Sequence, residues 1–480
     1  MQITVGFDFD LTLADTRAGI ARVWDWLAET TGVVIDSAQV AQRLGPPLEQ
    51  EMSRQFPDAS PERLTELVEL FRSRYDEFAI PSTTAMPGAL EAIAAVRAAG
   101  GRVLVISAKH TPAVKRHVDE LGLDVDEVIG DAWAEQKGAL LAERSATVYV
   151  GDHLGDVTAA KFAGAAAVGV ATGPIDAAGL AGAGAEVVLS DLTEFPAWFE
   201  DHLLDTRLEA LRTGLSELGS VLVAFSGGAD SAFVLAAAVR ALGPDQVVAA
   251  TAVSPSLPQS ELAPAAEFAA SLGVRHLTPR TNEMDRAGYR ANSGMRCYFC
   301  KSELLDVLGP LAAETGLAHV VTGTNADDAI AGFRPGIRAA DERGAVTPLL
   351  AAGITKAQVR EASRRWELPT WNKPAAACLS SRIAYGIEVT PTRLARVEHA
   401  ESALRDELVR AGIAVRNLRV RDLGETARIE VDHDQVEKVQ AASTVIERVR
   451  ATGFDRVVVD PGGFRSGSMN ELLPNPDRYR

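Results

Sequence analysis

Short apolar runs alternate with longer helix-like segments along most of the chain. Runs of four to eight apolar residues bounded by Gly, Pro or charge are typical of buried parallel strands. In the first 200 residues such runs occur at 3–9, 102–106, 146–150 and 166–170. Residues 17–75 are helix-like, so the pattern predicts a doubly wound α/β domain with a helical insertion after its first strand.

A second alternating series begins at Val221. Apolar runs at 221–225, 246–253 and 319–322 predict another parallel sheet that ends near residue 385, and residues 203–218 predict an amphipathic helix leading into it. Beyond 390 the pattern predicts a helix at 392–411, strands at 418–421 and 428–431, a helix at 434–452 and a strand at 456–459. We therefore expect an α/β domain at 1–200 with its insertion at about 15–85, a linker helix at 201–215, a second α/β domain at 216–385 and an α+β domain at 386–480.

Composition narrows the classes of function. A chain of 480 residues is too long for one core, and 47% apolar residues exclude global disorder. The net charge of −17 disfavours a large nucleic-acid ligand but leaves small anionic substrates open. No apolar run reaches membrane-spanning length and no export signal is visible, so we expect a cytoplasmic protein. Three cysteines, an odd number, argue against a disulfide framework.

Polar residues follow three strands of the first domain, at the edge where α/β sheets bind ligands. Asp8 can attack phosphorus to form an aspartyl-phosphate, and Asp10 can protonate the leaving group and then activate water. Ser107 can bind a phosphoryl oxygen, and Lys137 can neutralise the charge that develops there. The string Gly151-Asp152-His153-Leu154-Gly155-Asp156 offers the hard oxygen ligands that Mg²⁺ prefers.

These pieces, in this order, resemble the haloacid dehalogenase (HAD) phosphatase superfamily over about residues 1–200. The resemblance implies a Rossmann-like core with a helical cap similar to that of phosphoglycolate-phosphatase-like members. It implies Asp8 as nucleophile, Asp10 as acid and base, and Lys137 as the lysine of the third motif. It also implies phosphate binding by Thr12 and Ser107, and Mg²⁺ binding by Asp8, Asp10, Asp152 and Asp156. Leu11 stands where many relatives have Gly. The alternative is an inactive domain retained for its contacts.

The string Ser226-Gly227-Gly228-Ala229-Asp230-Ser231 lies between a strand-like run and a helix-like segment. Its glycines allow a tight turn, and the N-terminus of the following helix favours an anion. Ser226 and Ser231 can donate to phosphate, and Asp230 can hold Mg²⁺. The string resembles the PP-loop of ATP pyrophosphatases, which make adenylates and release diphosphate. The resemblance implies an adenine nucleotide alpha hydrolase-like domain that binds ATP through Ser226, Gly227, Gly228, Asp230 and Ser231.

The three cysteines lie in two strings after this loop. Cys297 and Cys300 form a CxxC between Arg296 and Lys301, cations that would lower the thiol pKa and favour thiolates. Cys378 belongs to the string at 373–382, which ends in an arginine. Further strings stand at 323–328, 334–336, 419–421 and 463–468.

Taken with the PP-loop, these strings resemble the LarE family over about residues 207–475. These are ATP-dependent sulfur transferases that mature the nickel-pincer nucleotide cofactor of lactate racemase. The resemblance implies a pyridinium-dicarboxylate mononucleotide as substrate, adenylated on a carboxylate and converted to a thiocarboxylate. It implies that Arg382, Arg419 and Arg421 bind substrate, the last two clamping its phosphate.

The family also bears on the source of sulfur and on partners. We favour a 4Fe–4S cluster held by Cys297, Cys300 and Cys378. The alternative is that catalytic Cys378 gives up its own sulfur. LarE relatives form hexamers, so we expect a homo-oligomer with nucleotide substrates, and other enzymes of nickel-pincer cofactor synthesis as possible partners.

Four other interpretations stay open. The CxxC with a histidine such as His319 could form a structural zinc site. A tRNA thiolase also combines a PP-loop with cysteines, and an amide-forming ligase would need ammonia. The first half could also be only a scaffold. If it is active, we hypothesise that it removes phosphate from an intermediate or side product of the same pathway.

Overall fold

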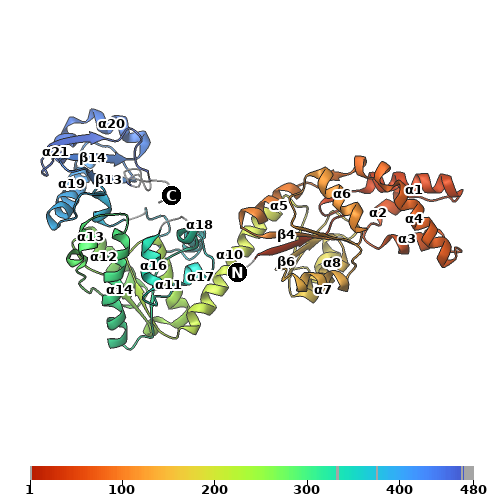
Figure 1. The fold of residues 1–480 in the computed structure, drawn as a ribbon, viewed down its shortest axis with the longest axis horizontal. Helices are drawn as coiled ribbons and strands as arrows, with labels where there is room; N and C mark the ends of the chain where they lie inside the picture. Colours follow the sequence, from red (N-terminus) through yellow and green to blue (C-terminus); the bar gives the residue numbers. More distant parts are fainter. Residues whose placement is uncertain (1–2, 331–333, 375–376, 466–468, 470–480) are drawn as a thin grey trace. The chain divides into compact units, whose positions relative to one another are not determined.

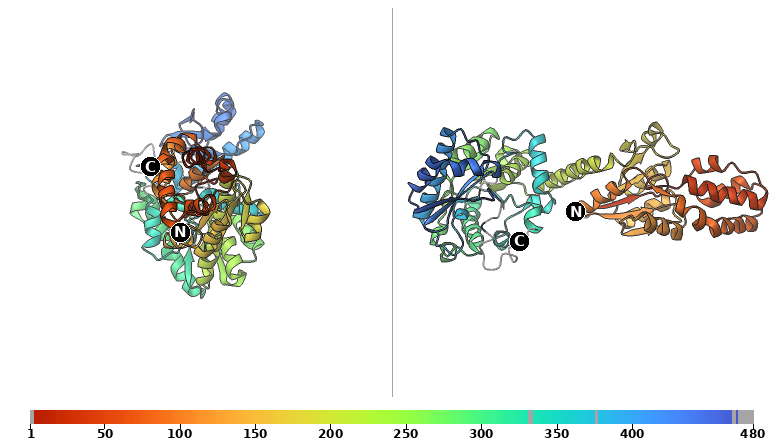
Figure 2. Two further views of the ribbon diagram at one scale, coloured as in Figure 1. Left: turned by 90° about the vertical axis from the view of Figure 1, so that its right-hand side faces the viewer. Right: turned by 90° about the horizontal axis from the view of Figure 1, so that it is seen from above.

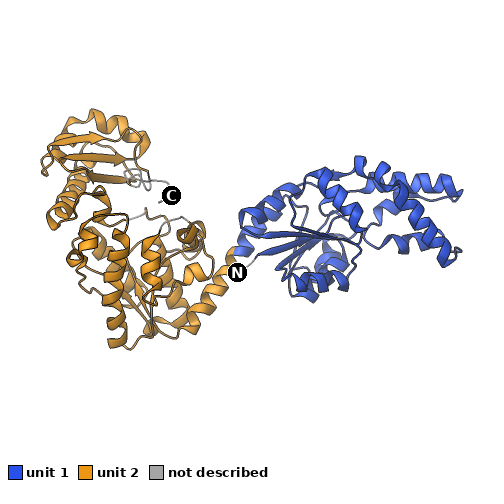
Figure 3. Cartoon of the chain, viewed as in Figure 1, with its two compact units in different colours: residues 1–203 blue, residues 204–480 orange. Residues whose placement is uncertain are grey.

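The structure is a computed structural model that describes residues 3–330, 334–374, 377–465 and 469. The chain forms two compact units, Met1–Leu203 and Leu204–Arg480 (Figure 3). Helix α10 (Phe195–Glu217) contributes Phe195 and Phe199 to the core of unit 1, and Leu211 and Leu215 to that of unit 2. Among the described residues, no helix is long and apolar enough to cross a membrane.

Unit 1 is built on a six-stranded parallel sheet in the order β5-β4-β1-β6-β7-β8 (Figure 1). The predicted strands are confirmed as β1 (Thr4–Phe7), β4 (Arg102–Ile106), β6 (Val148–Gly151) and β7 (Ala166–Val170). The sequence pattern did not reveal the outer strands β5 (Glu127–Ile129) and β8 (Val187–Leu189), because each has only three residues and most of them are only partly buried.

Helices cover both faces of this sheet, as expected for a doubly wound fold. One apolar cluster joins a face of the sheet to α5 (Ala89–Ala98), α6 (Thr111–Leu121) and the start of α10. A second cluster joins the other face to α7 (Glu135–Glu143), α8 (Leu154–Ala163) and α9 (Ala177–Ala183). Strand β1 is therefore buried from both sides, which explains its continuous apolar run.

The helical insertion is confirmed and has an apolar core of its own, which includes Trp24, Leu27 and Phe71. The chain enters and leaves it through the antiparallel pair β2 (Ala14–Asp15) and β3 (Thr84–Ala85). We call this part the cap; its helices are α1 (Arg17–Thr31), α2 (Ser37–Gln42), α3 (Leu48–Gln55) and α4 (Pro61–Phe78).

Unit 2 begins with a second parallel sheet, in the order β11-β10-β9-β12. Strands β9 (Val221–Ala224), β10 (Val247–Ala250) and β12 (His319–Val321) match the predicted runs, and short β11 (Arg275–Leu277) was missed. One face packs on α10, α11 (Ala229–Leu242), α12 (Leu262–Ser271) and α18 (Lys356–Arg365), and the other on α14 (Arg296–Glu314).

The end of unit 2 is the expected α+β arrangement (Figure 2). Helix α19 (Pro391–Arg410) packs on a sheet of β13 (Leu418–Asp422), β14 (Thr426–Val431) and β15 (Arg456–Val459). The single helix predicted at 434–452 is wrong, because Ala442 is not helical and separates α20 (Val436–Ala441) from α21 (Ser443–Arg450). Buried Val439 and Val445 are six residues apart, so on one continuous helix they would face different directions.

A buried histidine joins the cap to the core of unit 1 and makes stability depend on pH. The Tyr75 hydroxyl lies 3.1 Å from His117 Nε2, and burial lowers the pKa of His117 to about 4. Between pH 6.5 and 4 the unfolded state takes up a proton that the folded state does not, so stability falls as pH falls. We expect His117→Gln to remove about 2 kcal/mol of this loss between pH 7 and 4.5. Thermal unfolding of the wild type and of His117→Gln at the two pH values measures this difference. Equal losses of stability in the two proteins would contradict the assignment to His117.

Two candidate active sites

The first candidate site lies at the carboxyl ends of β1, β4 and β6, which are neighbours in the sheet of unit 1. Asp8 follows β1, Ser107 follows β4, and Asp152 and Asp156 follow β6. Asp8, Asp152 and Asp156 are buried, and one oxygen of each lies within 4.8 Å of the others. The structure thus brings the carboxylate of Asp8 close to those of Asp152 and Asp156, which lie more than 140 residues further along the chain.

Lys137 lies against these carboxylates and is almost fully buried. Its Nζ is 2.8 Å from Asp8 Oδ1 and 2.7 Å from Asp156 Oδ1. Burial raises the pKa of Asp8 to about 7 although Lys137 opposes the shift, and burial together with the Asp8 charge raises the pKa of Asp152. One ammonium group does not balance three buried carboxylates, so the donor set fits a divalent cation such as Mg²⁺.

Asp10 faces different partners. It accepts a hydrogen bond from Thr16 and forms a 2.5 Å ion pair with Lys109, whereas the group of close carboxylates excludes it. The expectation that its carboxylate binds Mg²⁺ finds no support in this geometry. An acid held beside a lysine is still placed to exchange a proton.

The remaining first-half residues surround the carboxylates. Thr12 Oγ1 donates to Asp152 Oδ1 at 3.1 Å, and buried Ser107 accepts from the backbone N–H of Lys109. Phosphate binding by Thr12 and Ser107 stays a prediction. Leu11 has a φ of 60°, a left-handed conformation that glycine adopts more easily, which explains why Gly suits that position in relatives.

The PP-loop forms the turn between β9 and α11, as predicted. Gly227 has a φ of 72°, a value that favours glycine there. Ser226 Oγ and Ser231 Oγ lie 3.1 Å apart, and Ser231 Oγ donates to the carbonyl of Gly228 at 3.0 Å. A cavity of about 420 Å³, which we call the PP-loop cavity, is lined by Ser226, Gly228, Asp230 and Ser231, while Gly227 does not line it.

Three lysines that were not predicted as site residues also line the PP-loop cavity: Lys301, Lys356 and Lys373. Lys356 Nζ forms a 2.6 Å ion pair with Asp230, and Lys373 Nζ pairs with Glu261 at 2.6 Å. Among the described residues, Lys301 has neither an ion pair nor a hydrogen bond, and burial lowers its pKa. Lysine is common, so only its position directly after the CxxC could have marked Lys301.

The three cysteines line a second cavity of about 450 Å³, the cysteine cavity. Cys297 and Cys300 lie in the first turns of α14, and Cys378 comes from the segment before Leu379. Four residues belong to both cavities and form a shared wall: Lys301, Leu304, Thr324 and Asp328. The structure thus places the thiols beside the PP-loop, as the sequence motifs implied.

The spacing of the thiols bears on what they could hold. The described residues contain no group of three cysteine Sγ atoms within 4.8 Å, whereas a tetrahedral zinc site needs thiolates about 3.8 Å apart. His319 is not among the residues that line the cysteine cavity, which removes the histidine considered for zinc. Three thiols around a larger space suit a polynuclear centre better than a single ion.

The expectation that flanking cations favour thiolates is wrong for these thiols. Burial raises the pKa of the Cys300 thiol well above its usual range, and Cys378 adds to the rise while Lys301 only partly opposes it. The protein atoms around Cys297 likewise raise the pKa of its thiol against the influence of Arg296. Cys378 Sγ lies 2.9 Å from Ser380 Oγ.

The three predicted substrate-binding arginines form a buried cluster in unit 2, not a solvated face. Arg382 pairs with Glu401 at 2.9 Å and Arg421 with Glu430 at 2.7 Å, two carboxylates that sequence reasoning missed. Burial, with the nearby charges of Arg382 and Arg421, lowers the pKa of Arg419 to about 10. None of the three arginines lines the PP-loop or cysteine cavity, so the phosphate clamp stays a prediction. Part of the string at 463–468, residues 466–468, lies outside the described residues.

Comparison with known proteins finds a matching family for each half of the chain. The haloacid dehalogenase-like hydrolase family matches residues 5–161, and the NAD synthase family matches residues 205–382. The pyridinium-3,5-bisthiocarboxylic acid mononucleotide synthase of Lactiplantibacillus plantarum is 33% identical over 271 residues, 56% of this chain and 96% of that protein. The chain belongs to the family of this synthase.

Other relatives match one half or the other. An uncharacterized protein of Synechocystis sp. is 43% identical over 274 residues, which is 56% of this chain and 99% of that protein. A probable phosphatase of Dickeya dadantii is 29% identical over 190 residues, 36% of this chain and 83% of that protein. A solved haloacid dehalogenase-like hydrolase from Bacteroides fragilis has a TM-score of 0.38 and 22% identity, and covers 40% of this chain and 99% of that chain.

The crowded carboxylates predict how Mg²⁺ changes stability. The pKa values of the Asp8 and Asp152 carboxyls are raised, so the folded state keeps protons that the unfolded state has already lost. Without metal, the stability of unit 1 therefore falls as pH rises from 3.8 towards about 7, the raised pKa of Asp8. We expect Asp152→Asn to raise metal-free stability at pH 8 by about 1 kcal/mol and to abolish most stabilisation by Mg²⁺. Thermal unfolding with and without Mg²⁺ measures both effects, with exposed Asp58→Asn as the matched control. An unchanged Mg²⁺ effect in Asp152→Asn would contradict the site.

Proposed function

We propose that the chain is a bifunctional enzyme. The second half adenylates the carboxylate of a pyridinium carboxylate mononucleotide with ATP and converts it to a thiocarboxylate, and the first half is a Mg²⁺-dependent phosphohydrolase. Membership of the synthase family supports the first activity. The observation that carries it is the shared wall, because the PP-loop and three thiols open on either side of the same four residues.

The need for two adjoining cavities follows from the chemistry. A carboxylate is a poor electrophile, so its oxygen first attacks the α-phosphorus of ATP and diphosphate leaves. Ser226, Ser231 and the loop N–H groups would bind the phosphates, and Asp230 would hold their Mg²⁺. A sulfur nucleophile then adds to the carbonyl carbon, and AMP leaves with the bonding electron pair.

Lys301 is placed to assist this second step. It lies in the shared wall and has no described partner, whereas Lys356 and Lys373 are both paired with acids near the PP-loop. Its ammonium group would neutralise the negative charge on the carbonyl oxygen while sulfur adds. The sequence position directly after Cys300 keeps it at the junction.

For the sulfur donor we propose a 4Fe–4S cluster on Cys297, Cys300 and Cys378. The cysteine cavity, which all three thiols line, supports it. Held by these three thiolates, such a cluster would supply a soft sulfur donor. The alternative, in which Cys378 itself donates sulfur, uses the same cavity.

In the first half, the Asp8 carboxylate would attack the phosphorus of a phosphate monoester. Lys137 neutralises charge between Asp8 and Asp156, and Asp10 exchanges the proton of the leaving group. The buried carboxylates fit Mg²⁺, which would offset the charge of the phosphoryl group when bound.

Separate measurements of diphosphate and thiocarboxylate test the sulfur-transferase proposal. We expect Asp230→Asn to lower diphosphate release at least 100-fold, because the Mg²⁺ of ATP loses its ligand. Lys301→Met should keep diphosphate release within about threefold and lower thiocarboxylate formation about 100-fold. Exposed Lys115→Met is the control. Wild-type protein that releases no diphosphate with any pyridinium carboxylate would overturn the proposal.

Iron and sulfide content test the sulfur donor. Anaerobically purified protein should contain about four iron atoms and four sulfides per chain and absorb broadly near 400 nm. Cys378→Ala should lose both, because one of three ligands is removed. An iron-free, active protein in which Cys378 has lost its sulfur after turnover would contradict the cluster and identify Cys378 as the donor.

A further inference from the structure

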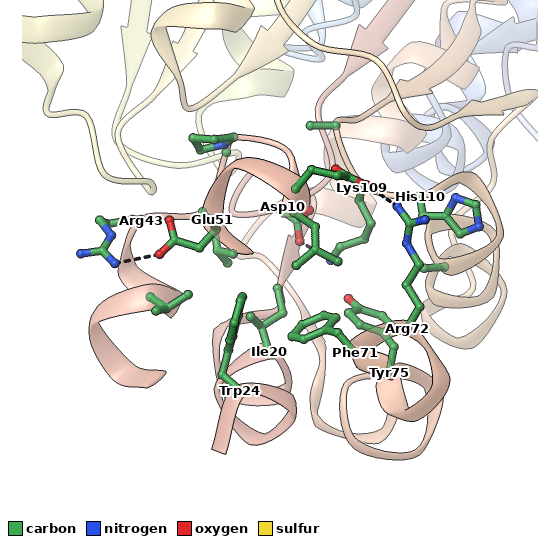
Figure 4. Close-up of a pocket in the computed structure, with 18 of the residues that line it drawn as sticks. Asp10, Ile20, Trp24, Arg43, Glu51, Phe71, Arg72, Tyr75, Lys109 and His110 are labelled. Carbon is green, nitrogen blue, oxygen red and sulfur yellow. Dashed lines mark hydrogen bonds and ion pairs between the residues drawn. The ribbon is translucent and has the colours of Figure 1, made fainter. Parts of the chain in front are cut away.

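A cavity of about 120 Å³ lies in unit 1, lined by residues of the cap and of the segment that follows β4 (Figure 4). Asp10 and Lys109 form part of its wall, whereas Asp8, Asp152 and Asp156 do not line it. In the proposed reaction Asp10 gives its proton to the leaving group. A leaving group that takes this proton lies next to Asp10, which the cavity borders.

Much of the wall opposite Asp10 is apolar. Figure 4 shows the side chains of Ile20, Trp24, Phe71 and Tyr75 from the cap around the cavity, and Val40 and Leu44 also line it. An engineered apolar cavity of about 150 Å³ holds benzene. A group the size of one small ring fits, and a nucleoside, with its base and ribose, is much larger.

The charged side chains that line the cavity already have partners of opposite charge. Because these pairs are formed, a second anionic group on the substrate would have to compete with a carboxylate for each lining cation. The pairs are Lys109–Asp10 at 2.5 Å, Arg43–Glu51 at 2.9 Å, Arg72–Glu49 at 2.8 Å, Arg116–Asp76 at 3.0 Å and His110–Asp131 at 3.2 Å.

We propose that this cavity binds the leaving group of a phosphate monoester, and that this group is uncharged, largely apolar and no larger than one ring. The inference rests on the proposed phosphohydrolase. An Asp8 oxygen bonds to phosphorus, the ester P–O bond breaks, and the alcohol oxygen takes its electron pair and a proton that Asp10 relays from its ion-pair partner Lys109. Water then releases phosphate from Asp8. Nucleotides, and esters that carry a carboxylate, would be poor substrates, which argues against the hypothesis that this half removes phosphate from a carboxylated nucleotide of the same pathway.

Three alkyl phosphates, phosphoglycolate and AMP, assayed for phosphate release by the full chain with Mg²⁺, test this class. Methanol and cyclohexanol are similar in acidity, so ring burial should make kcat/KM about 100-fold higher for cyclohexyl than for methyl phosphate. Isobutyl phosphate and phosphoglycolate have leaving groups of the same shape, and the uncharged ester should be at least tenfold better. AMP should be at least 100-fold worse than cyclohexyl phosphate.

A substitution that fills the cavity separates binding there from general reactivity. Leu44 is partly exposed, so Leu44→Trp adds bulk to the cavity with little strain and should lower the cyclohexyl-to-methyl ratio at least tenfold. Val34→Trp places the same side chain on the exposed surface of the cap and should leave the ratio unchanged.

The outcomes distinguish the two proposals. Phosphate release that is equal for methyl and cyclohexyl esters, or faster from phosphoglycolate or AMP, overturns the assignment of the cavity and leaves the phosphohydrolase intact. A cyclohexyl-to-methyl ratio that Leu44→Trp leaves unchanged likewise overturns the assignment of the cavity and leaves the phosphohydrolase intact. Release of phosphate from no ester, with wild type matching Asp8→Asn, overturns the phosphohydrolase and with it the cavity's role.

Discussion

Parallel pairing of strands is the constraint on which both sites depend. Parallel neighbours end at the same edge of a sheet, so residues far apart in the sequence meet there. In unit 1 this edge gathers the residues after β1, β4 and β6, and in unit 2 it places the PP-loop after β9 beside the segment that follows β12. The helices on the faces hold the strands in register and leave this edge open.

The main buried charged clusters of the two units differ in sign. In unit 1, Lys137 serves two of three buried carboxylates, so the local charge is negative and a divalent cation is favoured. In the arginine cluster of unit 2, Arg382 pairs with Glu401 and Arg421 with Glu430, and burial beside these two arginines lowers the pKa of Arg419. The first arrangement suits a cation that in turn can bind phosphate, whereas in the second each of these two glutamates is paired with an arginine.

Strand positions and motif residues were largely predictable from the sequence, because buried parallel strands are continuous apolar runs that end in polar strings. Short edge strands such as β11 were not, since they are only partly buried. The PP-loop and the aspartates of unit 1 have distinctive spacing, but Lys356 and Glu401 do not, because one lysine or glutamate in a helix has no sequence signature. The raised pKa of the Cys300 thiol depends on its burial, which adjacent cations in the sequence do not reveal.

The wall common to the PP-loop and cysteine cavities has a kinetic consequence. Mixed anhydrides of carboxylic acids with AMP are lost to water when they diffuse away from the protein that makes them. Because Leu304, Thr324 and their neighbours border both spaces, an activated acid formed on one side needs to move only a short way to meet a sulfur donor. Competition between transfer and wasteful hydrolysis is then set by how long the pocket retains its intermediate, not by diffusion between separate enzymes.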